Sequence, residues 1–155
     1  MINGKLDDID LKLLMYLQQD ARMNNVRLGQ LIGLTSGPVQ TRIEKLEEAG
    51  YIERYQAVVN RVKVNRPVLV ILLICLQAQQ AGLMQDFERR LVALPEVQSC
   101  YIVAGRWNYV VHVSMPTPQD YAVWLFEHIT SHENIKEVQS NFMLFESKSY
   151  SGLPL

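Results

Sequence analysis

The chain has 155 residues, of which 48% are hydrophobic and 20% are charged, and its net charge is −1. These values are typical of a folded globular protein and argue against a disordered chain, a polybasic membrane anchor or a protein that coats nucleic acid over its whole surface. The longest apolar run, residues 68–76, has about half the length of a membrane-spanning helix. The first residues do not form a secretory signal, so we expect a cytoplasmic protein without a membrane partner.

Apolar residues recur at helical spacing near the N-terminus. Leu6, Ile9, Leu13 and Leu17 are three or four positions apart, and aspartates crowd the expected start, where the helix dipole favours anions. This pattern predicts a helix from Asp8 to Gln19. It would supply the third helix that a two-helix unit needs for a core, with its aspartates pointing away from any nucleic acid.

Two short helices follow, joined by a tight turn. Gly33 can end the first with a positive φ, and the second has a cap at Thr35 or Ser36, Pro38 in its first turn and Gly50 just past its end. The apolar faces are Val26, Leu28, Leu31 and Ile32 on the first helix, and Val39, Ile43 and Leu46 on the second. The pattern is that of a helix-turn-helix, although a plain two-helix hairpin carries the same caps.

The outer face of the second helix is small and polar, which suits the major groove of DNA. We expect Gln40 and Thr41 to read bases and the nearby cations to contact phosphates. The predicted DNA-binding residues are Arg22, Thr35, Ser36, Gly37, Pro38, Gln40, Thr41, Arg42 and Lys45. Residues 22–63 hold seven Lys and Arg against four Glu, an excess so modest that more than one such unit must bind together.

The rest of the chain alternates strands and helices. Residues 51–60 are predicted to be extended, and 61–66 form a linker between a domain at 1–60 and a domain at 67–155. Strands are predicted at 68–77, 97–104, 109–115 and 136–147, with helices at 83–94, where Leu83, Phe87, Leu91 and Leu94 share one side, and at 118–130, capped by Thr117. This is the ferredoxin-like βαββαβ order.

The predicted fold class is therefore α+β, with an N-terminal helix-turn-helix (winged-helix-like) domain and a C-terminal ferredoxin-like domain. Two helices cover only one face of a four-stranded sheet, and the other face is too apolar for water. We expect that face to pack on a second copy and form a homodimer.

Cysteines and histidines offer little chemistry. Cys75 and Cys100 lack a CxxC spacing and are expected to be small buried residues. His128 and His132, each beside a Glu, have a spacing that suits a divalent metal, but solvation at a helix end is the favoured interpretation. The sequence shows no phosphate-cradling loop and no nucleophile elbow, so we predict no enzyme activity, no cofactor and no metal site.

The order of these parts resembles the Lrp/AsnC family of feast/famine transcription regulators over essentially the whole chain. The resemblance is carried by Leu6-Asp-Asp-Ile-Asp10, Asp20-Ala-Arg22, Leu31-Ile-Gly-Leu-Thr-Ser36, Arg42-Ile-Glu-Lys-Leu-Glu47, Gly50-Tyr-Ile52, and Leu94-Pro-Glu-Val97 leading to Gly105. It implies double-stranded DNA as a partner, a second domain of the RAM type that binds small amino acids, and dimers that assemble into tetramers or octamers.

The resemblance also implies an effector loop between the middle strands, which in the family reads Gly-Asp-x-Asp-Tyr and faces a hydroxyl residue on the last strand. The implied effector-binding residues here are Gly105, Arg106, Trp107, Asn108, Tyr109 and Ser140. Both acidic positions are lost, and a guanidinium stands where a carboxylate would pair with an α-ammonium. Either the ligand differs, with an extra acidic or polar amide group, or the loop is only structural.

Two classes of function remain. The favoured one is a sequence-specific transcription regulator whose oligomerisation and DNA binding respond to a small amino acid or a related metabolite. The alternative is a ligand-independent architectural DNA-binding protein or a stand-alone sensing module.

Overall fold

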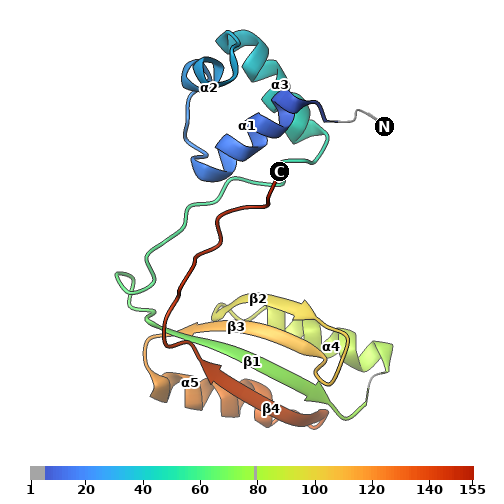
Figure 1. Ribbon diagram of the computed structural model, residues 1–155. Helices are drawn as coiled ribbons and strands as arrows, with labels where there is room; N and C mark the ends of the chain where they lie inside the picture. Colours follow the sequence, from blue (N-terminus) through green and yellow to red (C-terminus); the bar gives the residue numbers. More distant parts are fainter. Residues whose placement is uncertain (1–5, 79) are drawn as a thin grey trace. The chain divides into compact units, whose positions relative to one another are not determined.

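The computed structural model describes residues 6–78 and 80–155, which form two compact units. One unit runs to Val58 and also contains Ser147–Leu155, and the other is Val59–Glu146. Figure 1 shows that the first is made of helices and the second of a sheet with helices. The inclusion of Ser147–Leu155 with the helices differs from the predicted division, which assigned these residues to the second domain.

The helical unit contains α1 (Asp8–Gln19), α2 (Asn25–Ile32) and α3 (Ser36–Glu48). The bounds of α1 are those predicted, because Asp7 caps it and accepts the backbone N–H groups of Ile9 and Asp10 at 3.0 and 2.8 Å. The side chain of Asp10 in turn accepts the N–H of Asp7 at 3.2 Å, which completes a capping box.

The turn between α2 and α3 depends on two glycines, Gly29 and Gly33. Gly33 ends α2 with φ 77°, as predicted. In addition, Gly29 lies against the chain that leaves α2: its carbonyl oxygen accepts the N–H of Leu34 at 2.9 Å, and a Cβ at position 29 would be 2.3 Å from the oxygen of Leu34. Only glycine fits there, because the backbone occupies the space of a side chain.

The core of this unit is small and made by all three helices. Val39 and Leu46 are buried and Ile43 packs against them, as predicted for α3. Val26 was predicted to be on the apolar face of α2 but is 60% exposed, so that prediction is wrong. The buried members of the core are Leu13, Leu14, Leu17, Leu28, Val39 and Leu46.

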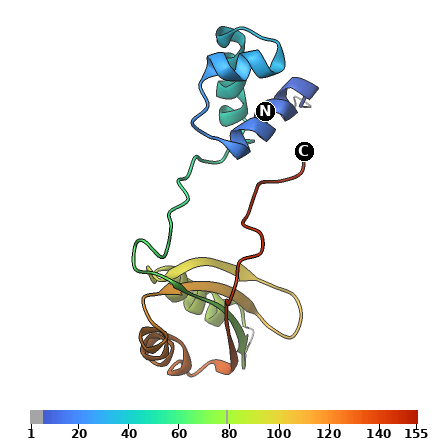
Figure 2. The same ribbon diagram turned by 60° about the vertical axis from the view of Figure 1, so that its left-hand side comes forward.

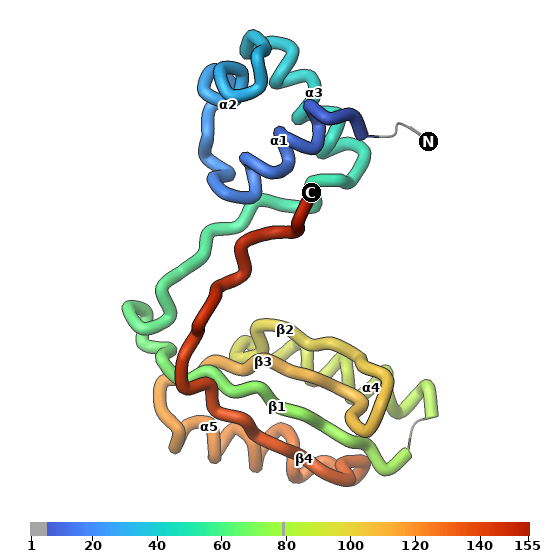
Figure 3. Tube along the Cα trace, viewed as in Figure 1, coloured from blue at the N-terminus to red at the C-terminus, as the bar shows by residue number. Residues whose placement is uncertain are grey.

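Two further segments belong to this unit. Residues 51–58 after α3 contain no strand, and they are held by Tyr55, whose hydroxyl donates to the carboxylate of Glu47 at 2.7 Å. Burial and this acceptor raise the pKa of Tyr55 to about 12. The chain end reaches α1 (Figure 3), where the amide of Gln18 bonds both the N–H and the carbonyl of Leu153 at 2.6 and 3.2 Å.

The second unit is a four-stranded antiparallel sheet of order β2-β3-β1-β4. Its strands are β1 (Val68–Leu76), β2 (Val97–Ile102), β3 (Tyr109–Met115) and β4 (Ile135–Phe142). With α4 (Ala81–Val92) between β1 and β2, and α5 (Pro118–Leu125) between β3 and β4, this is the predicted ferredoxin-like order. Figure 2 shows both helices on one face of the sheet.

Thr117 caps α5, as predicted: its hydroxyl accepts the N–H of Asp120 at 3.1 Å. The chain then continues as a π-helical turn, η1 (Phe126–Thr130). On α4, Phe87 and Leu91 are buried, but Leu83 is 44% exposed and does not belong to the apolar side, contrary to the prediction.

The core of the sheet unit is larger than that of the helices. Its buried residues are Val70, Leu72, Ile74, Leu76, Phe87, Leu91, Tyr109, Val111, Val113, Met115, Tyr121, Trp124 and Ile129. Both cysteines are free; Cys75 is buried and Cys100 half-buried. Burial, together with Glu88, raises the pKa of Cys100 to about 11.

Among the described residues of the sheet unit, no helix packs on the other face of the sheet. Leu69, Ile71 and Leu73 of β1 and Val110 of β3 alternate with the core residues and are only partly buried. None of the helices in the described part of the chain has the length and apolar character that a bilayer crossing requires.

Candidate functional site

The outer face of α3 is polar and open to solvent. Ser36, Gly37, Gln40, Thr41 and Lys45 are all exposed, while the apolar residues of the same helix point into the core. The orientation predicted from the spacing of Val39, Ile43 and Leu46 is therefore present.

The side chain of Gln40 is held in place on this face. Its Nε2 donates to Oε1 of Glu44, one turn later, at 2.9 Å. The hydroxyl of Thr41 donates to the carbonyl of Gly37 at 3.3 Å. Glu44 was not among the predicted site residues, and its i, i+4 spacing from Gln40 is the signal that could have revealed it.

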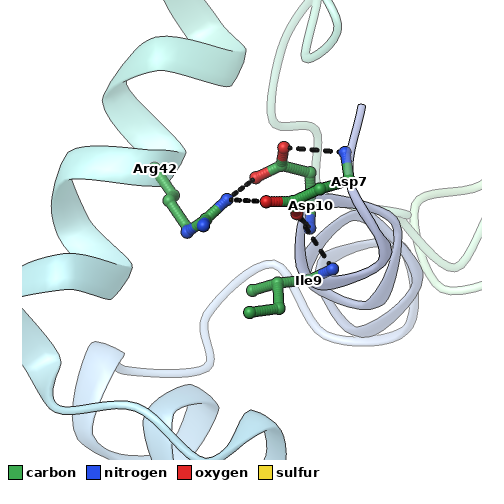
Figure 4. A network of polar contacts seen from close by, with 4 residues as sticks. All are labelled: Asp7, Ile9, Asp10 and Arg42. Carbon is green, nitrogen blue, oxygen red and sulfur yellow. Dashed lines mark hydrogen bonds and ion pairs between the residues drawn. The ribbon is translucent and has the colours of Figure 1, made fainter. Parts of the chain in front are cut away.

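Arg42 does not point outward with the other polar residues of α3. Its guanidinium forms ion pairs with Asp7 at 2.8 Å and Asp10 at 2.7 Å, the two residues of the α1 capping box (Figure 4). The hydrogen bonds that Arg42 donates to Asp10 and Asp7 raise its pKa. The pKa of Asp7 is lowered, chiefly by the N–H of Asp10 and further by Arg42. Arg42 thus connects the start of α1 to the middle of α3.

The other predicted DNA-binding residues lie at the edges of this surface. Thr35 occupies the cap position of α3 without a side-chain hydrogen bond to the helix. Pro38 is exposed in the first turn of α3, and Arg22 is exposed in the turn between α1 and α2. Lys45 is left as the outward cation on α3.

The predicted effector loop joins β2 to β3, and its last residues are used by the fold. Asn108 is 6% exposed; its Oδ1 accepts the N–H of Leu76 and its own N–H donates to Ile74, both at 2.8 Å. Tyr109 is fully buried, with its hydroxyl donating to the carbonyl of Met84 at 3.2 Å. Burial raises the pKa of Tyr109. These two side chains face the core and not a ligand on the loop surface.

Arg106 and Trp107 are on the open side of the same loop. The guanidinium of Arg106 pairs with the carboxylate of Glu137 on β4 at 2.6 Å, and its carbon lies 4.9 Å from the centre of the Trp107 ring. The positive charge that the sequence indicated for a ligand is therefore balanced by an acidic side chain of the same chain. Sequence reasoning missed Glu137, which is 31 residues away from Arg106.

Within one chain, the structure does not bring Ser140 to the loop. Ser140 lies opposite Leu72 in the middle of β1, and its hydroxyl is 2.5 Å from that of Tyr121 on α5. Ser140 is therefore on the helix-covered side of the sheet. The other predicted effector residues are consecutive in and next to the loop between β2 and β3: Gly105, Arg106, Trp107, Asn108 and Tyr109.

Comparison with known sequences gives two family matches that cover most of the chain. The family described as the Lrp/AsnC ligand binding domain matches residues 69–153, and the winged helix-turn-helix DNA-binding family matches residues 6–53. The leucine-responsive regulatory protein of Haemophilus influenzae is 28% identical over 153 residues, which is 99% of this chain and 92% of that protein. The proline dehydrogenase transcriptional activator of Rhizobium radiobacter is 29% identical and covers 96% of this chain and 94% of its own.

Solved structures show the same architecture. A transcriptional regulator of Neisseria meningitidis in complex with L-methionine superposes with a TM-score of 0.92 at 27% identity, covering 97% of each chain. A regulator of the AsnC family from Agrobacterium tumefaciens superposes with a TM-score of 0.90 at 31% identity, covering 96% of this chain and 97% of its own.

Proposed function

Because this chain belongs to the Lrp/AsnC family of transcriptional regulators, we propose that it reads specific DNA sequences with the outer face of α3 and that a small amino acid modulates this binding. The protein is a regulator and not an enzyme. The observation that carries the proposal is the exposed polar face of α3 on a helix-turn-helix whose apolar residues are buried behind it.

Gln40 is the main base-reading residue in this proposal. A glutamine reads adenine by accepting from N6 with its oxygen while donating to N7 with its nitrogen. The bond to Glu44 uses one N–H of the Gln40 amide and leaves its oxygen and second N–H for the base. Thr41, on the same face, would contact a neighbouring base, and Glu44 itself can accept from the amino group of cytosine.

Phosphates are assigned to the edges of the surface. The N–H groups of Ser36 and Gly37, between Thr35 and Pro38, lie at the start of α3, where a helix N-terminus favours an anion. Lys45 and Arg22 would supply charge-assisted contacts. Arg42 is given a different role from the one predicted: held by Asp7 and Asp10, it positions α3 relative to α1 and does not contact DNA.

The DNA-reading proposal is tested by footprinting on DNA from upstream of the protein's own gene. A Gln40→Ala/Thr41→Ala variant should lose sequence preference while retaining salt-dependent binding to any duplex, because only base contacts are removed. The matched control is Gln85→Ala, which replaces an exposed glutamine of α4 and should give the same footprint as the parent. If the double variant protects the native site as well as the parent does, α3 is not the reader.

We also propose a homodimer formed through the uncovered face of the sheet, with assembly of dimers into tetramers or octamers, and a cytoplasmic location. Half-buried Leu69, Ile71, Leu73 and Val110 support the dimer, because a face of this kind is seldom left in water. Replacing Leu73 with Asp would place a charge in the interface. Light scattering should then show dissociation, and a folded parent of 17.8 kDa would contradict the proposal.

The amino-acid response is supported by the ligand-binding domain that the chain matches and by the methionine bound to the Neisseria meningitidis regulator. One observation favours the second candidate, a ligand-independent DNA-binding protein: most of the predicted effector residues already have partners within the fold. Measuring DNA affinity with and without each of the twenty amino acids separates the two candidates.

A further inference from the structure

A groove separate from the loop lies between α4 and η1 on the helix-covered side of the sheet. Its volume is about 630 Å³, within the usual range for small-molecule sites. Phe87, Leu91 and Leu94 form the apolar part of its lining. Phe87 and Leu91 are 2% and 1% exposed, so the floor is fixed by the core of the sheet unit.

The rim carries charges of both signs that lack an ion-pair partner. Arg90 of α4 and Glu133, after η1, both line the groove. Within the part of the chain that the structure describes, neither forms an ion pair, although the adjacent Arg89 is paired with Asp86. The two segments that border the groove therefore each contribute a charged side chain outside any ion pair of the described residues, a guanidinium from α4 and a carboxylate from the residues after η1.

The segment that carries Glu133 is held in position. Nδ1 of His132 accepts the N–H of Asn134 at 3.2 Å, and the side chain of Asn134 exchanges two hydrogen bonds with the backbone of Ala78 at 2.9 and 3.1 Å. The ring of His132 also meets Phe87 edge-on, with centres 5.1 Å apart. Because Nδ1 is an acceptor, the neutral ring carries its proton on Nε2, which can donate to a ligand.

The π-helical turn contributes to the shape of the groove. The π-helical hydrogen bonds of Phe126–Thr130 span one more residue than those of an α-helix, and Ile129 is fully buried within this turn. His128 and Ser131, on either side of Ile129, line the groove. Glu127, whose carboxylate lies 4.0 Å from Nε2 of His128, is a further acidic residue of the lining.

We propose that this groove binds a free α-amino acid with an apolar side chain. Arg90 receives the α-carboxylate, Glu133 receives the α-ammonium, and Phe87 and Leu91 contact the hydrocarbon side chain. The charges of the groove complement those of a zwitterion, whereas on the loop Arg106 is neutralised by Glu137. This inference rests on the proposed amino-acid response and gives it a place other than the loop.

Calorimetry on the full-length protein tests the assignment with L-leucine, L-methionine and two leucine analogues. Leucinamide lacks the carboxylate and 4-methylpentanoate lacks the ammonium. Arg90→Gln should weaken L-leucine binding by about 10- to 100-fold and abolish the preference for leucine over leucinamide, because a charge-assisted contact is lost. Glu133→Gln should abolish the preference for leucine over 4-methylpentanoate.

Arg89→Gln is the matched control, since it removes a guanidinium of the same helix that is already paired, and it should bind leucine like the parent. Parental binding by both Arg90→Gln and Glu133→Gln overturns the groove. If an Arg106→Ala/Trp107→Ala variant then loses binding, the loop is the site and the proposed amino-acid response stands. If the parent binds no amino acid, the proposed groove site and the proposed amino-acid response are both wrong. The DNA footprint still tests separately whether α3 reads the DNA sequence.

Discussion

The helical unit leaves most of its predicted binding residues on its surface, whereas the sheet unit uses most of its own to hold itself together. Gln40, Thr41 and Lys45 are free to meet a partner, but Asn108 and Tyr109 are buried. The difference arises because the orientation of α3 follows from the spacing of its own residues, which places the apolar side chains in the core and the polar ones in solvent. The loop after β2, in contrast, meets β1 and α4, which are distant in sequence.

Two arginines, one from each unit, can be compared by the acidic residues with which they pair. Arg42 and Arg106 were each predicted to bind a ligand, and each is paired with acidic residues of the same chain. Arg42 is half-buried and bonded to two carboxylates, while Arg106 is largely exposed and bonded to one. An arginine at a predicted binding site is therefore not by itself evidence for a ligand contact.

The largest expected effect tests whether Tyr109 belongs to the core. Tyr109→Ala should lower the free energy of unfolding of the sheet unit by about 3–5 kcal/mol, because a fully buried aromatic ring is removed. Tyr109→Phe keeps the ring and loses only the bond to Met84, at a cost of about 1 kcal/mol. Urea unfolding measures both, and a Tyr109→Ala variant with parental stability would contradict the assignment to the core.

The next effect concerns the two glycines of the helix-turn-helix. Gly29→Ala should destabilise the helical unit by about 3 kcal/mol, because its Cβ would overlap the backbone oxygen of Leu34. A Cβ at position 33 would meet no atom within 4 Å, so only the positive φ of Gly33 opposes the substitution. Gly33→Ala should therefore destabilise the unit by only about 1 kcal/mol. Helicity during thermal unfolding distinguishes them; equal losses would show that α2 and the turn are further apart than described.

A third prediction uses pH to examine the link between α1 and α3. The pKa of Asp7 is lowered in the folded state, so its contribution to stability is present above the ordinary aspartate pKa of about 3.9 and is lost as the pH falls through the lower folded value. Arg42→Gln should lower the melting temperature at neutral pH and make the acid loss shallower.

Part of that acid loss should remain in Arg42→Gln, since the N–H of Asp10, the main cause of the shift, is still present. Arg22→Gln, which removes an exposed arginine of the same unit, serves as the control and should leave the acid profile unchanged. An identical profile for Arg42→Gln and the parent would mean that the ion pairs with Asp7 and Asp10 do not hold in solution.

The smallest effect is expected at Arg106. Its ion pair with Glu137 joins two side chains that are 69% and 43% exposed, so Arg106→Ala should change the free energy of unfolding by at most about 1 kcal/mol. The change should shrink further in high salt. Denaturant melts at two salt concentrations measure it, and a loss as large as that of Tyr109→Ala would show that the loop depends on this pair.

Patterns among neighbouring residues were enough to predict the helices, the cap of α5 and the order of the strands. The bounds of α1, the left-handed Gly33, the cap at Thr117 and the inward face of α3 follow from contacts between residues that are close in sequence. The alternation of apolar strands and amphipathic helices predicted the ferredoxin-like order, because connections between such elements allow few arrangements.

Only the tertiary structure decided which polar side chains are available to a partner. Arg42 meets Asp7 across 35 positions, and Asn108 meets Leu76 across 32. Periodicity carries no information about such pairs, since they depend on how whole elements pack. The same holds for the groove between α4 and η1, where Arg90 and Glu133 come together only because the two segments cover one sheet.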